Sequence, residues 1–239
     1  MSLMGIRTWL RMSRISMWLF ARRAVRSYSQ FGEDAVLRGL MKERVADRSY
    51  RGFWVDIGAH HPVRHSNTKM FSDLGWRGIN VDAMDESIRL FKKVRRRDIN
   101  VHAGVGDAAG EMDYYVFTDP AYNSFSKDWM KEMEGAEVPK VRKVRVETLK
   151  ALLDKHLPSG QHIDFLDVDV EGLDLAVLRS NDWTRYCPDF ILVEIRGPEP
   201  WHSPVADYLL SVGYVFAAQC RFTTVFKRNQ TVQNGGENE

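Results

Sequence analysis

Two acidic residues stand at the ends of apolar runs in the first third of this 239-residue chain. Asp56 lies in the run 53–57, two residues before Gly58, and Asp82 ends the run 78–82. A glycine after a strand lets the backbone approach a ligand closely. An acid after a second strand can accept hydrogen bonds from both hydroxyls of a ribose. The pair therefore predicts a site for a cofactor that contains adenosine.

The same region does not predict a pyrophosphate site. The pattern G-x-G-x-x-G is absent, and the helix expected over residues 66–74 begins eight residues after Gly58. Gly104 and Gly106 follow a third apolar run, where we interpret the two glycines as a turn. S-adenosylmethionine has adenosine but no phosphate, and its zwitterionic methionine end needs polar groups. The sequence therefore favours S-adenosylmethionine over the NAD of an oxidoreductase.

Three further acids alternate in the run that ends at Gly172. Asp167, Asp169 and Glu171 have the period-2 spacing that places side chains on one face of a strand. Acids on a buried strand are unfavourable unless they meet water, a cation or a ligand. We expect Asp169 and Glu171 to face an acceptor substrate. The alternative is that one of them caps the helix that follows.

Other candidate site residues come after the first and fifth apolar runs. Glu194 lies near the end of the run 190–195, at the same expected edge of a sheet. His60, His61 and His65 follow the first run, as possible general bases or substrate contacts, or as ordinary loop histidines. A histidine pair without a third ligand at metal spacing is a weak indication of a zinc site, so the metal requirement stays open. We take His61 and Glu194 as alternative bases to Asp169 and Glu171.

These residues need a scaffold, and the periodicity predicts one. Strands are expected at 53–57, 78–82, 100–105, 163–168 and 190–195, with further strands at 112–117, beside the third, and 141–146. Helices are expected at 32–45, 66–74 (capped by Ser66 or Asn67), 86–94, 148–156, 173–179 and 205–212. The alternation implies an α/β fold, a mostly parallel twisted sheet with helices on both faces. Runs 214–219 and 222–227 add an antiparallel C-terminal hairpin strand.

Charge is unevenly distributed along the chain. Six arginines precede the first acid, Glu33, whereas the remainder is mildly acidic. A nucleic-acid binder would be basic over its whole domain, so that class is excluded. In a helical projection the apolar residues of 1–27 gather opposite most of the arginines. Three interpretations stay open: a helix on an anionic membrane surface, a mitochondrial presequence, or a helix packed on the domain.

Composition places the rest of the chain. The charge-free run 15–21 is too short to span a bilayer, and Arg22-Arg23 follows it instead of a small-residue cleavage site. Cys187 and Cys220 are too few for a disulfide framework, which favours a location in the reducing cytoplasm. If the N-terminal helix binds lipid, the protein would lie on the inner face of the membrane. We expect an N-terminal helix at 1–27, a catalytic domain at 28–228 and a disordered tail at 229–239.

Several segments together resemble the FkbM-type methyltransferases. They read FWVDIGAHHP at 53–62, SNT at 66–68, GWRGINVDA at 75–83, AYNSFS at 121–126, IDFLDVDVEG at 163–172 and SNDW at 180–183. The resemblance covers roughly residues 28–228 and implies a Rossmann-like methyltransferase fold, S-adenosylmethionine as cofactor and O-methylation, often of sugars. Many relatives carry Glu-Pro where Asp82-Ala83 stands here. The Asp82 side chain is one methylene shorter than the glutamate of those relatives.

The expected function is therefore O-methylation of a sugar hydroxyl in polysaccharide or glycoconjugate biosynthesis. Residues expected to line the cofactor are Asp56, Gly58, Ala59, Asn67, Asp82, Ala83, Val105 and Gly106. Residues 119–140, with Asn123, are expected to close over the acceptor as a lid. The alternatives are a non-sugar small molecule or a lipid as acceptor, or a catalytically idle protein recruited to membranes.

Overall fold

The computed structural model describes residues 25–128, 140–197 and 199–229. Most of the segment 1–27, nearly all of the tail 229–239 and most of the second half of the expected lid lie outside these ranges. No helix among the described residues has the length and apolar character that crossing a membrane requires.

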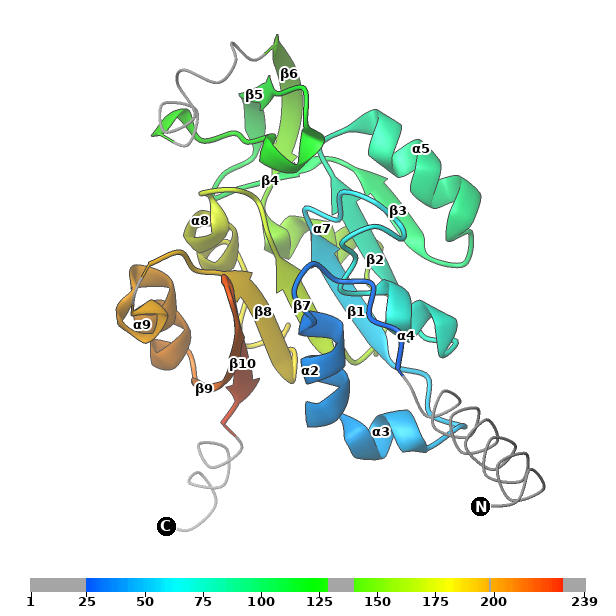
Figure 1. Cartoon of the computed structure of the whole chain (residues 1–239). Helices are drawn as coiled ribbons and strands as arrows, with labels where there is room; N and C mark the ends of the chain where they lie inside the picture. Colours follow the sequence, from blue (N-terminus) through cyan, green and yellow to red (C-terminus); the bar gives the residue numbers. More distant parts are fainter. Residues whose placement is uncertain (1–24, 129–139, 198, 230–239) are drawn as a thin grey trace, which may run out of the picture.

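A seven-stranded sheet forms the centre of the molecule (Figure 1). Its strands are β1 Phe53–Ile57, β2 Arg77–Asp82, β3 Ile99–His102, β7 Phe165–Val168, β8 Phe190–Glu194, β9 Tyr214–Cys220 and β10 Thr223–Arg228. Their order is β3-β2-β1-β7-β8-β10-β9, and β10 runs antiparallel to both of its neighbours. The predicted α/β fold with its antiparallel hairpin strand is confirmed. The strand order reverses between the neighbouring strands β1 and β7. Sheets of this kind bind ligands at such a reversal point.

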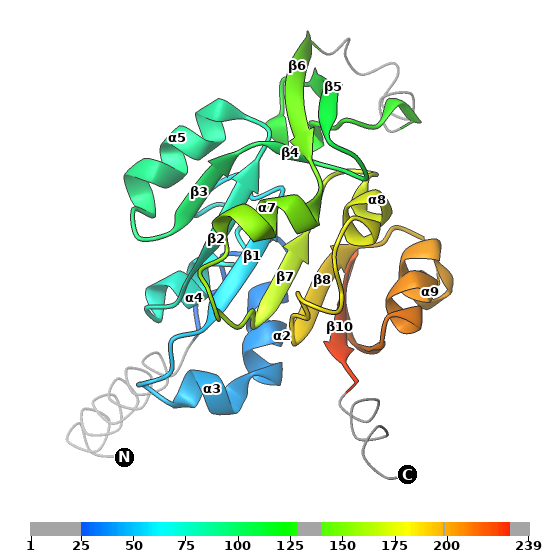
Figure 2. The same ribbon diagram turned by 180° about the vertical axis from the view of Figure 1, so that it is seen from behind.

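Helices cover both faces of the sheet, because successive residues of each strand point to opposite sides. Trp54 packs with residues of α2 (Glu33–Leu40) and α4 (Lys69–Asp73), whereas Val55 belongs to the cluster of α7 (Leu149–His156), α8 (Asp174–Arg179) and α9 (Pro204–Ser211). Figure 2 shows α7 in front of the sheet when the molecule is seen from behind. On the edge that ends in β3, α5 (Asp85–Val94) packs against β2 and β3.

Two predicted helices differ in detail from the structure. The helix expected over 32–45 is broken at Met41 into α2 and α3 (Lys42–Ala46). The cap expected at Ser66 or Asn67 is wrong, since Thr68 precedes α4 and makes no side-chain cap. The reason is that polar side chains there bond to strand acids: Thr68 Oγ1 donates to Asp56, and Asn67 Nδ2 donates to Asp167.

A small sheet stands over the carboxyl ends of β1 to β3. It contains β4 (Gly104–Val105), β5 (Gly110–Val116) and β6 (Lys140–Glu147) in the order β4-β6-β5. The predicted strand 100–105 therefore divides at Ala103, and the strands expected at 112–117 and 141–146 leave the main sheet. Tyr114, Phe125 and Val146 form the apolar core under this small sheet. The small sheet thus makes a wall above the expected ligand edge.

Candidate functional site

A cavity of about 740 Å³ opens at the carboxyl ends of β1, β2 and β7, below the small sheet. Its volume is within the range of small-molecule and cofactor sites. Eleven residues expected from sequence line it together: Asp56, Gly58, Ala59, His61, Asn67, Asp82, Ala83, Val105, Asp169, Glu171 and Glu194. Gly106 does not line it; the Gly106 N–H donates to the Glu147 carbonyl at 3.1 Å and so continues the small sheet.

Asp82 is buried at the end of β2 with donors on both carboxylate oxygens. Oδ2 accepts from the His60 N–H and Oδ1 from the Met84 N–H, each at 2.7 Å. Burial raises the pKa of Asp82 to about 6, and the hydrogen bonds from the two backbone N–H groups oppose this shift. Because a carboxylate oxygen has two lone pairs, each oxygen keeps one for a further donor such as a ribose hydroxyl.

A second pair of acids lies on adjacent strands. Asp56 of β1 and Asp167 of β7 are partners in register, and both are buried. Burial raises the pKa of Asp56 to about 7, with Arg95 opposing the shift. The pKa of Asp167 is also raised, by burial and by the nearby Asp56. A positively charged ligand group between these carboxyls would relieve their mutual repulsion.

Gly58 has a structural role that the sequence did not reveal. Its φ is +89°, and an added Cβ would lie 1.8 Å from the Asp169 carbonyl oxygen. The Asp169 N–H in turn donates to the Ile57 carbonyl at 3.0 Å. The expected close approach is therefore between the loops that follow β1 and β7, and it fixes Asp169 beside the cofactor edge.

Asp169, Glu171 and Glu194 form a carboxylate cluster at the other side of the cavity. One ligand oxygen from each lies within 4.8 Å of the others. The Arg196 guanidinium bonds to Glu171 at 3.0 Å and to Glu194 at 3.1 Å. The Asp169 carboxylate is open to the cavity and accepts no hydrogen bond from the described residues. It is thus the member of the cluster that is most available to a substrate.

Burial, and after it electrostatic repulsion, raises the pKa values of two of these carboxylates. Burial raises the pKa of Glu171 to about 8, with Glu194 adding to the shift and Arg196 opposing it. The pKa of Asp169 is raised well above its ordinary value, by the surrounding protein atoms and then by Glu194 and Glu171. Although the Asp169 side chain reaches the cavity, protein encloses it on its other sides, and this concave setting accounts for the direction. A carboxylate of raised pKa is a stronger general base.

The loop histidines are used differently from what the sequence suggests. His61 Nδ1 accepts the Val63 and Arg64 N–H groups at 3.0 and 2.8 Å. The proton of the neutral ring is then on Nε2, so neither nitrogen has a lone pair left to take a substrate proton. Burial lowers the pKa of His60 to about 4, with Arg64 and His61 adding to the shift. The geometry therefore favours the carboxylate cluster over His61 as the source of a base.

The backbone is strained around the cavity. The non-glycine residues of the described chain with positive φ are His60, His65, Glu171 and Arg221. The first three line the cavity, and Arg221 directly precedes Phe222, which lines it too. A left-handed backbone conformation is energetically unfavourable for a residue with a side chain, and residues in this conformation are concentrated at functional sites.

Several cavity residues were missed by the sequence reasoning. Tyr114 and Phe125 come from the small sheet and its connection, and Arg196 and Phe222 from the region of β8 and β10. Phe125 could have been found from the sequence, because it lies in the segment AYNSFS at 121–126, which is part of the family resemblance.

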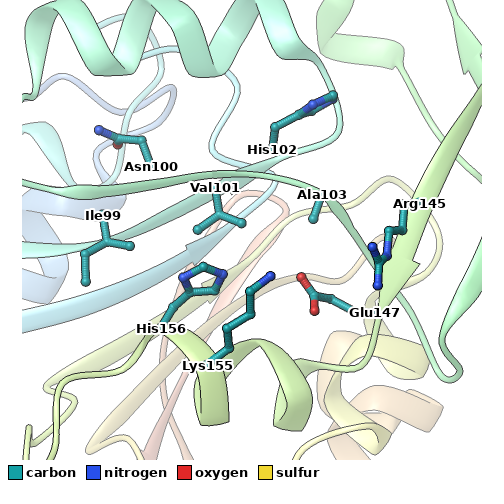
Figure 3. A pocket seen from close by; sticks show the side chains of 9 residues that line it. All are labelled: Ile99, Asn100, Val101, His102, Ala103, Arg145, Glu147, Lys155 and His156. Carbon is teal, nitrogen blue, oxygen red and sulfur yellow. The ribbon is translucent and has the colours of Figure 1, made fainter.

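A second cavity, of about 490 Å³, lies on the far side of β3. Figure 3 shows the Glu147 carboxylate between Lys155 and Arg145, with His156 below β3. None of the expected site residues lines this cavity, so the first cavity is the candidate active site.

The chain is similar to solved structures and to one family model. No curated protein matches the chain. Among solved structures, it is similar to the methyltransferase FkbM of Methylobacillus flagellatus KT, with 13% identity, a TM-score of 0.46 and coverage of 74% of this chain and 43% of that one. It is also similar to the T. thermophilus 16S rRNA N2 G1207 methyltransferase in complex with AdoMet and guanosine, with 11% identity, a TM-score of 0.43 and coverage of 82% and 43%. The chain thus spans less than half the length of either protein.

The model of the methyltransferase FkbM domain matches residues 56–216, which is more than half of the chain and includes every residue discussed for both sides of the cavity except Phe222. The chain therefore belongs to the FkbM methyltransferase domain family, whose cofactor is S-adenosylmethionine.

Proposed function

We propose that this protein transfers a methyl group from S-adenosylmethionine to a hydroxyl of a sugar, in the synthesis of a polysaccharide or glycoconjugate. The observation that supports it best is one cavity with two different acidic sides. Asp82 has lone pairs left for a ribose on one side, and the carboxylate cluster of Asp169, Glu171 and Glu194 lies on the other.

The residues on the first side fit the cofactor. Asp82 would hold the ribose hydroxyls, and Ala83 and Val105 would contact the adenosine. Asp56 and Asp167 would stabilise the positively charged methionine end, since both carboxyls have raised pKa values in the absence of a cation. These residue types match a ligand with a ribose and a positive charge.

The residues on the second side fit a hydroxyl acceptor. A sugar hydroxyl is a poor nucleophile until a base takes its proton. When bound, the cofactor supplies a methyl carbon whose bond to positively charged sulfur breaks, with its electron pair going to sulfur, as a lone pair of the acceptor oxygen forms the new bond. Asp169 would take the hydroxyl proton. Arg196 would keep Glu171 and Glu194 in place as acceptors for neighbouring hydroxyls.

An aromatic ring supports a sugar as the acceptor. Phe222 lines the cavity with 37% of its surface exposed, and its carbonyl accepts from the Ile195 N–H at 2.8 Å. Phe31 packs edge-on against the Phe222 ring, at 5.9 Å between centroids. A sugar has an apolar C–H face and hydroxyls at its rim, so a ring beside three carboxylates offers contacts to both.

The test is methylation of defined glycosides. Purified protein is incubated with S-adenosylmethionine and, separately, methyl β-D-glucopyranoside, methyl α-D-mannopyranoside and methyl α-L-rhamnopyranoside. We expect S-adenosylhomocysteine to form together with an O-methylated glycoside, identified by mass spectrometry and NMR. Phosphatidylethanolamine vesicles and a simple catechol serve as lipid and non-sugar acceptors. Methylation of either of these, with no product from the glycosides, would replace the sugar proposal.

A further inference from the structure

Arg95 is a buried cation to which the proposed reaction assigns no role. It directly follows α5, in a basic run whose next two arginines, Arg96 and Arg97, are exposed. The Arg95 side chain is 1% exposed and lies against the face of Trp54, with 4.8 Å between the guanidinium carbon and the ring centroid. Burial of a guanidinium is unfavourable unless charges and acceptors surround it. Arg95 must therefore have partners for its charge and for its donors.

Hydrogen bonds from Arg95 reach two parts of the fold. Nε donates to Asp98 Oδ2 at 2.7 Å, and Nη2 donates to Asn80 Oδ1 at 3.3 Å. Nη1 donates to Thr68 Oγ1 at 3.1 Å and to the Pro62 carbonyl at 3.5 Å. The last two acceptors belong to the connection between β1 and α4, part of which lines the cavity. Arg95 thus joins the β2–β3 edge of the sheet to the loop beside the cofactor.

The Thr68 hydroxyl lies between Arg95 and Asp56. A hydroxyl has one proton and two lone pairs, and an arginine N–H can only donate. Arg95 therefore occupies one Thr68 lone pair, and Thr68 donates its proton to Asp56 Oδ2 at 3.1 Å. Ser66 Oγ, 3.2 Å from Thr68 Oγ1, can then only donate to the second lone pair. Asp56 must accept at this position, and a hydrogen bond to a carboxylate favours its ionised form.

Asp56 is the residue through which Arg95 reaches the cavity. Burial raises the pKa of Asp56 to about 7, and Arg95 is the strongest of the groups that oppose this shift. The carboxylates that face Asp56 repel its charge: Asp82, Asp98 and Asp167. Arg95 lies behind Asp56 and does not itself line the cavity. Its charge therefore acts on a ligand through the carboxylate and not by direct contact.

We propose that Arg95 is a positioning residue for the cofactor, which through the Thr68 hydroxyl keeps Asp56 ionised and oriented to bind the ammonium group of the methionine end. This inference rests on the cofactor contacts of the proposed function and is independent of the sugar acceptor. An ionised carboxylate forms a charge-assisted hydrogen bond with an ammonium group, which a protonated carboxyl cannot do. Removal of Arg95 should hence affect the amino-acid part of the ligand and spare the nucleoside part.

Two ligands and four variants test this role. S-adenosylhomocysteine carries the ammonium group, whereas 5′-methylthioadenosine has the same nucleoside and a thioether without the amino-acid end. The main variant combines Arg95→Met with Asp98→Asn, because removal of a whole buried ion pair leaves no unpaired charge. Arg95→Lys keeps the charge, Thr68→Val removes the hydroxyl between Arg95 and Asp56, and Arg96→Met alters the exposed neighbour as matched control. Dissociation constants of both ligands are measured by calorimetry from about pH 6 to about pH 9, on either side of the Asp56 pKa, together with Tm.

We expect the double variant to bind S-adenosylhomocysteine about 10-fold more weakly at neutral pH, and 5′-methylthioadenosine within about twofold, because a nearby opposite charge lowers a carboxyl pKa by about 1–3 units. Wild-type affinity for S-adenosylhomocysteine should rise with pH and level off as Asp56 ionises. The double variant should level off about one pH unit higher or more, since its Asp56 ionises later. Thr68→Val should change the profile in the same direction. Arg95→Lys should largely restore it, and Arg96→Met should match the wild type.

Failure of the inference and failure of the proposed function give different results. Equal weakening of both ligands in the double variant would mean that Arg95 only shapes the cavity, and an unchanged pH profile would mean that Asp56 does not depend on it. Either result overturns the inference and leaves the sugar proposal in place. Binding of S-adenosylhomocysteine by the wild type without methylation of any glycoside would remove the sugar proposal alone. If the double variant does not fold, the comparison of the two ligands in Thr68→Val decides in the same way.

Discussion

Asp82 combines structural hydrogen bonds with acceptor capacity that is left over for a ligand. Its two backbone donors hold the loops after β1 and β2 together, yet each oxygen keeps a free lone pair. Asp82→Ala should weaken S-adenosylhomocysteine binding by about 1–3 kcal/mol, because ribose hydroxyls lose their acceptor. Isothermal titration calorimetry measures this directly. Asp85→Ala removes a nearby acid on α5 that lies outside the cavity, and it should leave the affinity unchanged. Equal affinities in the two variants would exclude Asp82 from the cofactor site.

Asp169 is the base that the geometry favours, and its removal should separate turnover from cofactor binding. We expect Asp169→Asn to lower kcat about 10²- to 10⁴-fold, as is typical for loss of a general base. S-adenosylhomocysteine affinity should be retained. Asp107→Asn, which alters an exposed acid after β4, is the matched control. Undiminished kcat in Asp169→Asn would transfer the role of base to Glu171 or Glu194.

The pH dependence of turnover follows from the same carboxylate cluster. A carboxyl whose pKa is raised stays protonated at a pH where an ordinary one is ionised, and only the ionised form can act as base. With the pKa of Glu171 at about 8 and that of Asp169 raised, wild-type kcat/KM should increase as pH rises from 6 and level off above about 8. A rate that falls over this range would contradict a carboxylate base of raised pKa.

The same residues show what a local pattern can predict. Period-2 spacing predicted that Asp169 and Glu171 lie on one face of a strand; both instead follow the end of β7, and they line one cavity with Glu194. Their role as a catalytic site stays a prediction. The same pattern grouped Asp167 with these two acids. In the structure Asp167 instead lies beside Asp56 and accepts a hydrogen bond from Asn67. Strand β7 ends at Val168, and the left-handed backbone at Glu171 turns its side chain toward Glu194 and Arg196. Neither feature has a local sequence signal, since both depend on contacts with other loops.

At the scale of elements, short apolar runs predicted strands well but not their partners. Strands β5 and β6 alternate as main-sheet strands would, yet they pair with each other in a separate sheet over seven residue pairs. The break at Ala103 between β3 and β4 is what turns the chain out of the main sheet. Pairing across the segment 117–139 is a long-range choice, and periodicity contains no information about it.

The contact between the loops after β1 and β7 gives a prediction at the same scale. Gly58→Ala places a Cβ against the Asp169 carbonyl at a backbone φ that disfavours side chains. We expect a loss of at least about 2 kcal/mol in the free energy of unfolding, which lowers Tm by roughly 4–8 °C. S-adenosylhomocysteine binding should weaken as well, because both loops line the cavity.

Gly39→Ala is the control for the glycine change itself. Gly39 lies in α2 with nothing within 4 Å of an added Cβ, so alanine there should stabilise the protein by about 0.5–1 kcal/mol. Thermal unfolding of both variants, followed by circular dichroism, provides the comparison. If Gly58→Ala is as stable as the wild type, the two loops do not have the tight contact described here.

At the scale of the whole molecule, hydrogen bonds attach the first described residues of the chain to α2. Asp34 accepts from Ser27 Oγ at 2.6 Å, from the Tyr28 N–H at 2.7 Å and from Ser29 Oγ at 2.8 Å. The Ser66 N–H donates to the Tyr28 carbonyl at 3.2 Å. The chain is therefore fastened to α2 and to the cavity rim from Ser27 onward. The expected boundary between an N-terminal helix and the catalytic domain, after residue 27, stays a prediction.

The arginines that precede this boundary lead to a prediction about the membrane. We propose that residues 1–26 bind anionic lipid surfaces and bring the cavity to membrane-assembled glycans. The support is the segregation of arginines from apolar residues in the sequence, and each arginine near such a surface contributes about 1 kcal/mol. Full-length protein should co-sediment with phosphatidylserine-containing vesicles at low salt and be released at high salt, because the attraction is screened.

A charge-matched pair of variants distinguishes the arm from general basicity. Replacing Arg7, Arg11 and Arg14 by glutamine should weaken vesicle binding by about 3 kcal/mol, roughly 100-fold. Replacing Lys92, Lys93 and Arg96 by glutamine removes the same charge from the exposed end of α5 and should leave vesicle binding nearly unchanged. Tm and S-adenosylhomocysteine affinity should be equal in both. A fall in Tm confined to the arm variant would instead mean that the arm packs on the domain, as a helix whose apolar face belongs to the folded core.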